Sequence, residues 1–221
     1  MIAENLINQM IPALKTSDLS EKAIIWMEEL KIDQLPVIAG GKFKGLITEE
    51  IILESNDLNK PISDYHLTSE NCYVGVHQHY FDILKITLEK SVQIVAVIDE
   101  NGDYMGVTSY EDALNEFAKS ITIQSPGGIL VVSVKQRDYL LAEISRIIES
   151  NNVKILGVYV STPYAEGENI YVTLKLNVND MATTVASLER YGYQIVAKFN
   201  DIDRSETSKE RIDHLMRYLN I

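Results

Sequence analysis

The first half of the chain alternates between stretches with apolar residues at helical spacing and short, continuous apolar runs. The first helical stretch starts with Asp18 and Glu21, whose spacing is that of a capping box. The apolar residues of the two helical faces are Ala23, Ile24, Met27 and Leu30 in the first stretch and Phe81, Ile83, Leu84 and Leu88 in the second. The pattern predicts the order helix, strand, glycine hairpin, strand and short helix, twice over.

The two parts of this first half are copies of one another. Residues 41–50 (GKFKGLITEE) and 102–111 (GDYMGVTSYE) both place a glycine turn, an aromatic residue, a second glycine and then a hydroxyl residue. Upstream, residues 35–38 (LPVI) correspond to residues 95–98 (VAVI). One strand pair is too small to be stable alone, whereas two copies packed face to face bury both apolar faces. We therefore expect two repeats related by an approximate two-fold axis.

The second half has a different pattern, which predicts the order β-α-β-β-α-β. A boundary at residues 120–128 ends in the turn cluster Ser125-Pro126-Gly127-Gly128. The predicted strands are 129–134, 153–161, 170–178 and 194–199, and the predicted helices are 139–150 and 180–191. We expect the helices to lie on one face of an antiparallel sheet.

The end of the chain predicts a separate amphipathic helix. Thr207 and Glu210 have the spacing of a capping box. The apolar residues that follow at helical spacing are Ile212, Leu215, Met216 and Leu219. Such a stripe needs a surface to cover, which is either this protein or its dimer mate, or a foreign partner. The predicted organisation is therefore residues 1–60 and 61–120 as two repeats, 126–200 as a second domain, and 205–221 as a terminal helix.

The charge and cysteine content exclude several classes of protein. The net charge is −12, from 32 acidic and 20 basic residues, which disfavours nucleic acid and anionic membranes as partners. The segment from Asp99 to Glu116 carries six acidic residues and no Lys or Arg. Cys72 is the only cysteine, so no internal disulfide and no cysteine cluster for a metal can form.

The chain also shows no sign of export or membrane insertion. No apolar run approaches the roughly 18–20 residues of a membrane span. The first residues, MIAEN, lack the basic flank and the long apolar stretch of a signal peptide. We expect a cytoplasmic protein that is not inserted into a membrane.

The repeat in residues 1–120 resembles a tandem pair of cystathionine-β-synthase (CBS) domains. The residues that carry this resemblance are 35–38, the strand ends 45–48 and 106–109, and the two helices that follow them. The second half resembles an ACT domain, a βαββαβ module for ligand binding and dimerisation, in which residues 140–144 (LLAEI) match the start of the first helix. A CBS pair followed by an ACT domain is the layout of acetoin-utilisation-type accessory proteins. The resemblance implies an α+β fold: a CBS pair with a C-terminal ferredoxin-like, ACT-like domain.

The CBS resemblance implies a binding site for an adenine nucleotide. In this family a hydroxyl residue meets phosphate, and an Asp three positions later accepts hydrogen bonds from the ribose. The second repeat has this pair as Ser109 and Asp112, whereas the first repeat has Thr48 followed by Ile51, which cannot accept a hydrogen bond. We therefore expect one site, with AMP, ATP or another adenosyl compound as a regulatory ligand and no resident cofactor. If the family geometry carries over, the walls of this site are Val74, Gly75, Val76, Val95, Ala96 and Val97.

An alternative interpretation of Ser109 and Asp112 needs no ligand. A hydroxyl residue followed three positions later by an acid is also a helix N-cap box, and the two roles are compatible. The acidic segment around this pair disfavours a triphosphate, because like charges repel. Lys15, Lys42 and Lys44 of the first repeat are candidates to offset that charge.

The ACT-like half departs from the amino-acid-binding members of its family. Those members carry Asp-x-Pro-Gly before the first helix, whereas this chain has Gln136-Arg137-Asp138-Tyr139. Tyr139 stands where the glycine lets a ligand approach the backbone, and its side chain would occupy the space of the ligand. We favour a structural, dimerising role over amino-acid binding.

Sequence features of catalysis are weak. His77 and His79 have no further Cys or His nearby, and zinc needs three or four ligands. No nucleophile elbow is present, and Gly40-Gly41-Lys42 lacks the remainder of a P-loop.

The best-supported function is a non-catalytic, homodimeric regulatory protein that senses an adenine nucleotide. The alternative is a constitutive dimeric scaffold, an accessory subunit for a separate enzyme or transporter. An enzyme in its own right is the weakest of the three.

Overall fold

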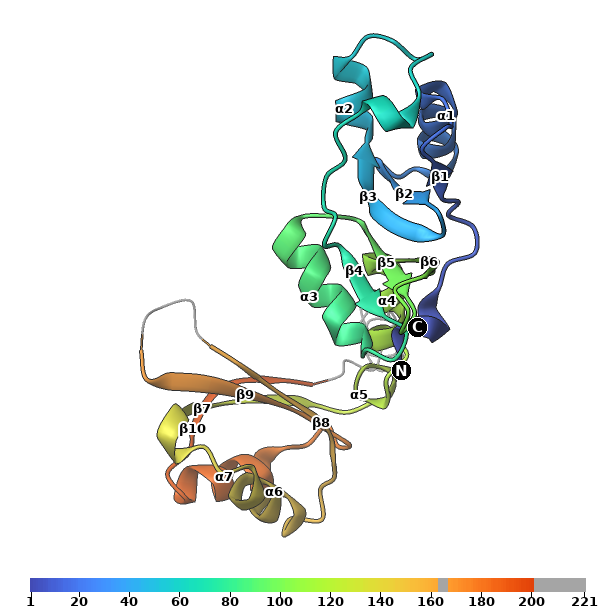
Figure 1. Ribbon diagram of the computed structural model, residues 1–221. Coiled ribbons are helices and arrows are strands. Elements are labelled where there is room, and N and C mark those ends of the chain that lie inside the picture. The colour runs from blue at the N-terminus through green and yellow to red at the C-terminus, as the bar shows by residue number, and fades with distance from the viewer. Residues whose placement is uncertain (163–166, 201–221) are drawn as a thin grey trace, which may run out of the picture. The chain divides into compact units, whose positions relative to one another are not determined.

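A computed structural model describes residues 1–162 and 167–200 (Figure 1). The chain divides into two compact units, Met1–Lys119 and Ser120–Ile221. The predicted terminal helix, with Thr207, Glu210 and the apolar stripe after them, lies outside the described residues. The helices of the part that is described are all too short, or too polar, to cross a membrane.

The first unit contains two three-stranded sheets with the same topology. The first sheet has the order β1-β2-β3 and the second β4-β5-β6, and in each the first pair of strands is parallel and the second antiparallel. The elements of the first repeat are β1 (Leu14–Lys15), α1 (Ser20–Leu30), β2 (Gln34–Ala39), β3 (Lys42–Thr48) and α2 (Glu49–Glu54). Those of the second are β4 (Tyr73–Gly75), α3 (Tyr80–Lys90), β5 (Ile94–Ile98), β6 (Tyr104–Ser109) and α4 (Tyr110–Ala118). The very short strands β1 and β4 are additions to the predicted pattern.

The two sheets match in register as well as in order. The register between β2 and β3 shifts after Val37, and the register between β5 and β6 shifts after Val97. Gly45 lies opposite Val37, and Gly106 lies opposite Val97. The two glycines therefore hold equivalent places, as the sequence repeat predicts.

Each repeat is completed by the segment that precedes the other repeat. The N-terminal segment, with the 3-10 helix η1 (Ala3–Leu6), lies on the second repeat, where the backbone N–H of Asn8 donates to Val107 O at 2.7 Å. The segment after α2, with η2 (Ile62–Asp64), lies on the first repeat, where Thr68 N donates to Leu46 O at 2.9 Å. Each repeat of the sequence thus packs its leading segment against the other copy.

Both glycines at the second position of the hairpin allow this close packing. Gly45 has φ +142° and Gly106 has φ +153°, which are conformations that favour glycine. A Cβ at Gly106 would lie 2.5 Å from Cγ2 of Ile7 in the N-terminal segment. A Cβ at Gly45 would lie 2.8 Å from the carbonyl oxygen of Thr68. The glycines are therefore where the leading segments approach the sheets most closely.

Two details of the predicted helices in this unit are wrong. Helix α1 has Leu19 at its N-cap, and its first turn has no capping box of Asp18 and Glu21. The Asp18 carboxylate instead accepts from Lys15 N at 2.8 Å and pairs with Lys22 at 2.9 Å. In α3, Ile83 is buried as predicted, but Phe81 and Leu88 are exposed. The sheet covers only part of the helix surface over which the apolar residues are spread.

The second unit is a four-stranded antiparallel sheet with strand order β10-β7-β9-β8. Its elements are α5 (Ile121–Gln124), β7 (Ile129–Lys135), the 3-10 helix η3 (Gln136–Asp138), α6 (Leu141–Glu149), β8 (Ile155–Ser161), β9 (Asn169–Leu176), α7 (Ala182–Arg190) and β10 (Gln194–Phe199). Helices α6 and α7 pack together on one face of the sheet (Figure 1). From β7 onward the order of strands and α-helices is the one that the sequence predicts. Within the predicted boundary, residues 121–124 are helical.

Candidate ligand-binding site

The candidate pair lies where β6 ends and α4 begins. Ser109 is the N-cap of α4, and its Oγ accepts from the backbone N–H of Asp112 at 3.0 Å. In return, Oδ2 of Asp112 accepts from Ser109 N at 3.0 Å and from Ser109 Oγ at 2.6 Å. The two residues therefore form a complete capping box, which is the interpretation that needs no ligand.

A third residue, which belongs to the N-terminal segment, contacts the same carboxylate. Nδ2 of Asn8 donates to Oδ2 of Asp112 at 3.3 Å. Asn8 is held there because its backbone pairs with Val107, next to the end of β6. Within residues 1–162 and 167–200, the hydrogen bonds to the Asp112 carboxylate all end on Oδ2, so Oδ1 retains its capacity to accept. The sequence pattern did not identify Asn8, because 104 residues separate it from Asp112.

In the first repeat, the residue equivalent to Ser109 also caps a helix, but no acidic residue stands in the place of Asp112. Oγ1 of Thr48 accepts from Ile51 N at 3.3 Å, at the start of α2. Ile51 packs against the apolar core of the first repeat. The position equivalent to Asp112 therefore offers no carboxylate to a ribose.

The residues expected as walls of the site belong to the sheet of the second repeat. Val74 pairs with Val97 between β4 and β5, and Ala96 pairs with Val107 between β5 and β6. Val74, Val95, Ala96 and Val97 have no exposed surface, while Gly75 and Val76 are half-buried. Gly75 N donates to Oε1 of Gln78 at 2.6 Å. Four of the six expected wall residues are thus part of the packed interior of the second repeat.

Of the lysines expected to offset the acidic segment, Lys42 reaches it. Its Nζ lies 2.8 Å from Oδ1 of Asp103 and donates to Asn101 O at 2.6 Å. Asp99, in the same turn, accepts a backbone hydrogen bond from Asp103, which lowers the pKa of its carboxyl group. The hairpin of the second repeat is therefore held partly by a lysine of the first.

His79 and Cys72 have structural roles here. Nδ1 of His79 accepts from Phe81 N at the start of α3, and His77 lies 3.8 Å from Glu100. In the described segments no three His, Cys, Asp or Glu side chains gather closely enough to hold a metal ion. Burial raises the pKa of the Cys72 thiol to about 11, so this cysteine is poorly nucleophilic.

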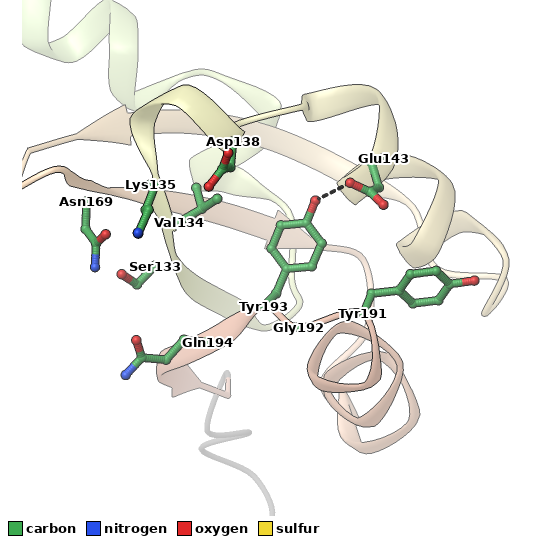
Figure 2. A pocket seen from close by; sticks show the side chains of 10 residues that line it. All are labelled: Ser133, Val134, Lys135, Asp138, Glu143, Asn169, Tyr191, Gly192, Tyr193 and Gln194. Atoms are coloured by element: carbon green, nitrogen blue, oxygen red, sulfur yellow. Dashed lines mark hydrogen bonds between the residues drawn. The ribbon is translucent and has the colours of Figure 1, made fainter.

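A cavity of about 390 Å³ lies in the second unit, where β7 ends and β9 and β10 begin (Figure 2). Its lining combines one end of the sheet with the start of α6 and the turn before β10. Tyr193 is buried there, and its hydroxyl donates to Oε2 of Glu143 at 2.9 Å. Burial raises the pKa of Tyr193 to about 12. The lining residues are Ser133, Val134, Lys135, Asp138, Glu143, Asn169, Tyr191, Gly192, Tyr193 and Gln194.

Tyr139, which replaces the glycine of amino-acid-binding relatives, is half-buried and packs against the apolar core of the second unit. It is the C-cap of η3, and its backbone N–H contributes to that turn by donating to Gln136 O. The tyrosine is absent from the lining of the cavity beside it. Its side chain therefore serves the packing of this unit.

Comparison with known proteins identifies the fold of about half the chain. No family model matches. A CBS domain pair/ACT domain protein from Thermotoga maritima matches with a TM-score of 0.50 and 20% identity, over 54% of this chain and 98% of that chain. A protein from Methanocaldococcus jannaschii matches with a TM-score of 0.49 and 18% identity, over 55% of this chain and 62% of that chain. The CBS domains of a transcriptional regulator from Streptococcus pneumoniae match with a TM-score of 0.47 and 16% identity, over 52% of this chain and 98% of that chain.

Proposed function

Starting from the CBS-pair fold of the first unit, we propose that this protein is a non-catalytic, cytoplasmic regulatory protein that senses an adenine nucleotide or a related adenosyl ligand. The ligand binds in the second repeat, at Ser109 and Asp112. The observation that carries the proposal is the state of the Asp112 carboxylate. One of its oxygens holds the start of α4, while the other is left to accept hydrogen bonds.

This arrangement suits a ribose phosphate. A carboxylate oxygen is a strong acceptor for the hydroxyls of a vicinal diol. The start of α4, next to Ser109, presents the positive end of a helix dipole to an anion. In its first turn, Tyr110 N and Asp112 N already donate to Gln93 O and Ser109 Oγ, which leaves the N–H of Glu111 for an anion. Because Ile51 replaces the acid in the first repeat, one ligand binds per chain.

The local charge favours a ligand with few negative charges. Lys42 neutralises Asp103, but Glu111 and Glu116 flank Asp112 on α4 and have no Lys or Arg between them. A triphosphate would be repelled by these carboxylates more strongly than a monophosphate or an uncharged adenosyl group. We therefore favour AMP or an adenosyl compound over ATP.

The second unit is the output module in this proposal. Its antiparallel sheet, with two helices on one face, supports an ACT-like role in dimerisation. Ligand binding shifts the balance between two arrangements of the dimer, which requires different affinities for the two. The partner is a separate enzyme or transporter, in a layout like that of acetoin-utilisation accessory proteins.

Calorimetric titration of the full chain with AMP, ATP and S-adenosylmethionine tests the site. The informative variant is Asp112→Asn, because the amide oxygen keeps the cap while the NH₂ group replaces the free acceptor with a donor. We expect Asp112→Asn to weaken binding by about tenfold or more, as expected for a lost hydrogen bond to a charged group. The matched control is Thr48→Ala, which removes the cap of the first repeat and leaves affinity unchanged. Equal affinities of wild type and Asp112→Asn would overturn the assignment of the site.

A second candidate function is a constitutive scaffold. Asp112 is already satisfied in part by Asn8 and Ser109, and the first repeat has Ile51 in the place of this acid. A stoichiometric partner recovered equally with and without nucleotide, together with no heat of binding in any titration, would favour this function over sensing.

A further inference from the structure

The four-stranded sheet of the second unit has two faces, and helices α6 and α7 cover one of them. The residues under these helices alternate along each strand, as Leu130 and Val132 do on β7. The residues between them therefore lie on the opposite face, which we name the open face. From the register of the strands, its apolar members are Ile129, Val131, Tyr159, Tyr171, Ala197 and Phe199.

The open face is more apolar than a sheet surface in contact with water needs to be. An antiparallel sheet with one solvated face usually has polar residues there. Tyr159 on β8 is 58% exposed and Phe199 on β10 is 57% exposed. These two strands are the edges of the sheet, and Val131 and Tyr171 lie half-buried on the strands between them. Apolar surface of this kind favours a covering element.

The short helix α5 shows that the open face accepts a helix. Oγ1 of Thr122 donates to Leu156 O at 3.1 Å. A Cβ at Gly157, which lies on the open face, would overlap the Thr122 side chain, so glycine is what lets α5 approach β8. Helix α5 has four residues and is about 6 Å long. Among the described elements it therefore covers one margin of the face and leaves the Tyr159 and Phe199 side chains exposed.

The chain continues from the edge of this same face. The last described residue, Asn200, directly follows β10, and residues 201–221 lie outside the described part. Six residues, 201–206, separate β10 from the predicted terminal helix and can span about 20 Å when extended. A helix over residues 207–219 would be about 20 Å long, whereas the three strand spacings from β10 to β8 measure about 14 Å. The segment therefore has the reach and the length to cross the sheet.

The sequence of this segment is complementary to the face. Its apolar stripe, Ile212, Leu215, Met216 and Leu219, occupies one side of a helix. The positions on the other side of the helix are polar: Glu210, His214 and Arg217. A stripe of four large apolar residues matches a surface whose exposed residues are themselves large and apolar.

We propose that residues 207–219 form a helix that docks on the open face of the same chain, beside α5, with the stripe against Val131, Tyr159 and Phe199. A short tether keeps this segment at an effective concentration in the millimolar range, which favours it over the same segment of a second copy. The docked helix completes the second unit, and its presence does not depend on the nucleotide site. The edges of the sheet and the outer sides of α6 and α7 then remain for partners.

Hydrogen exchange of the full chain, followed by mass spectrometry, tests this docking. A helix of 13 residues is marginal when isolated, so slow exchange in residues 210–219 reports contact with a surface. The informative variant is Tyr159→Lys/Phe199→Lys, which makes both exposed margins of the face charged. The matched control is Ile25→Lys/Leu114→Lys, since these two residues of the first unit are 47% and 51% exposed.

We expect residues 210–219 to exchange about tenfold faster or more in the face variant than in wild type, because the apolar surface that holds the stripe is lost. The control should match wild type. Slow exchange of β7 and β9 in every protein shows that the sheet is folded. Fast exchange of residues 210–219 in wild type, or equal protection in wild type and the face variant, would overturn the proposal. Protection that rises with protein concentration would also overturn it, by assigning the face to the segment of a second copy.

Discussion

At the scale of single residues, the candidate site shows what a local pattern can identify. Ser109 and Asp112 are three positions apart, and that spacing predicts the capping box that the structure contains. The contribution of Asn8 depends on how the N-terminal segment docks on β6, which a local pattern does not encode. Lys42 was one of three lysines that the sequence offered to the acidic segment, and its docking on Asp103 of the other repeat shows which of the three pairs with this acid. The local spacing alone is not sufficient, because Asp18 and Glu21 have it as well and form no capping box at the start of α1.

The contact between Asn8 and Asp112 has a measurable consequence. Ligand binding at Asp112 keeps this hydrogen bond if Oδ1 takes the ribose, and Asn8 then holds the carboxylate in place. We expect Asn8→Ala to weaken AMP binding by about three- to tenfold, because Asn8 acts on the ligand only by holding the carboxylate, and a typical hydrogen bond contributes a net free energy of about 1 kcal/mol. Asn8→Asp, which places a second carboxylate beside Asp112, should weaken it further. Tighter binding by Asn8→Ala in calorimetry would mean that Asn8 competes with the ligand.

Tyr193 gives a prediction for the pH dependence of stability. Burial raises the pKa of its phenol from an ordinary value of about 10 to about 12 in the folded protein. Because the folded state holds this proton more tightly than the unfolded state does, the stabilisation is fully present below pH 10 and is lost as the pH rises from about 10 to 12. We expect a Tyr193→Phe variant to lose less stability than wild type across this interval. Denaturant titrations of both proteins at about pH 10 and pH 12 measure the free energy of unfolding. Identical losses in wild type and variant would show that Tyr193 does not hold its proton more tightly in the folded state.

At the scale of elements, the repeat was the most informative signal. The glycine, aromatic and hydroxyl positions of the two hairpins predicted β2, β3, β5 and β6 and the helices around them. The strands β1 and β4 have only two and three residues, too few for an apolar period to show. The exposed Phe81 and Leu88 of α3 were not predictable, because the apolar spacing does not show how much of the helix surface the sheet covers.

The docking of the leading segments can be tested at Gly106. An alanine there would carry a Cβ 2.5 Å from Cγ2 of Ile7, in a backbone conformation that favours glycine. We expect Gly106→Ala to lower the free energy of unfolding by about 1–3 kcal/mol, in the range of overpacked sites. Gly41→Ala is the control, because Gly41 also has positive φ but a Cβ there would meet nothing closer than 3.8 Å. Equal losses in the two variants, measured by denaturant titration, would show that backbone conformation alone is responsible.

At the scale of the whole molecule, the dominant property is its acidity. The net charge of −12 and the acidic residues near Asp112 both act against polyanionic ligands. Composition predicted this property in full, because it needs no knowledge of contacts. The division into two units was indicated by the change of pattern near residue 120, since the repeat of the first half does not continue beyond it.

This acidity predicts how salt changes ligand preference. At low ionic strength we expect AMP to bind more tightly than ATP, because the triphosphate meets more repulsion. Salt screens charges separated by more than about 10 Å at 0.1 M. The ratio of the two dissociation constants should therefore move toward one as salt is raised. A ratio that does not change with salt, in calorimetric titrations of both nucleotides, would show that the preference has a steric origin.

The crossed leading segments make the two repeats of the first unit mutually dependent. A chain cut in the exposed stretch at residues 56–59 would yield one fragment that holds Asn8 without β6 and another that holds Thr68 without β3. Neither fragment has the piece that finishes its own sheet, and each carries the piece that the other lacks. We expect the separate fragments to remain incompletely folded and to restore the native structure by complementation when they are mixed.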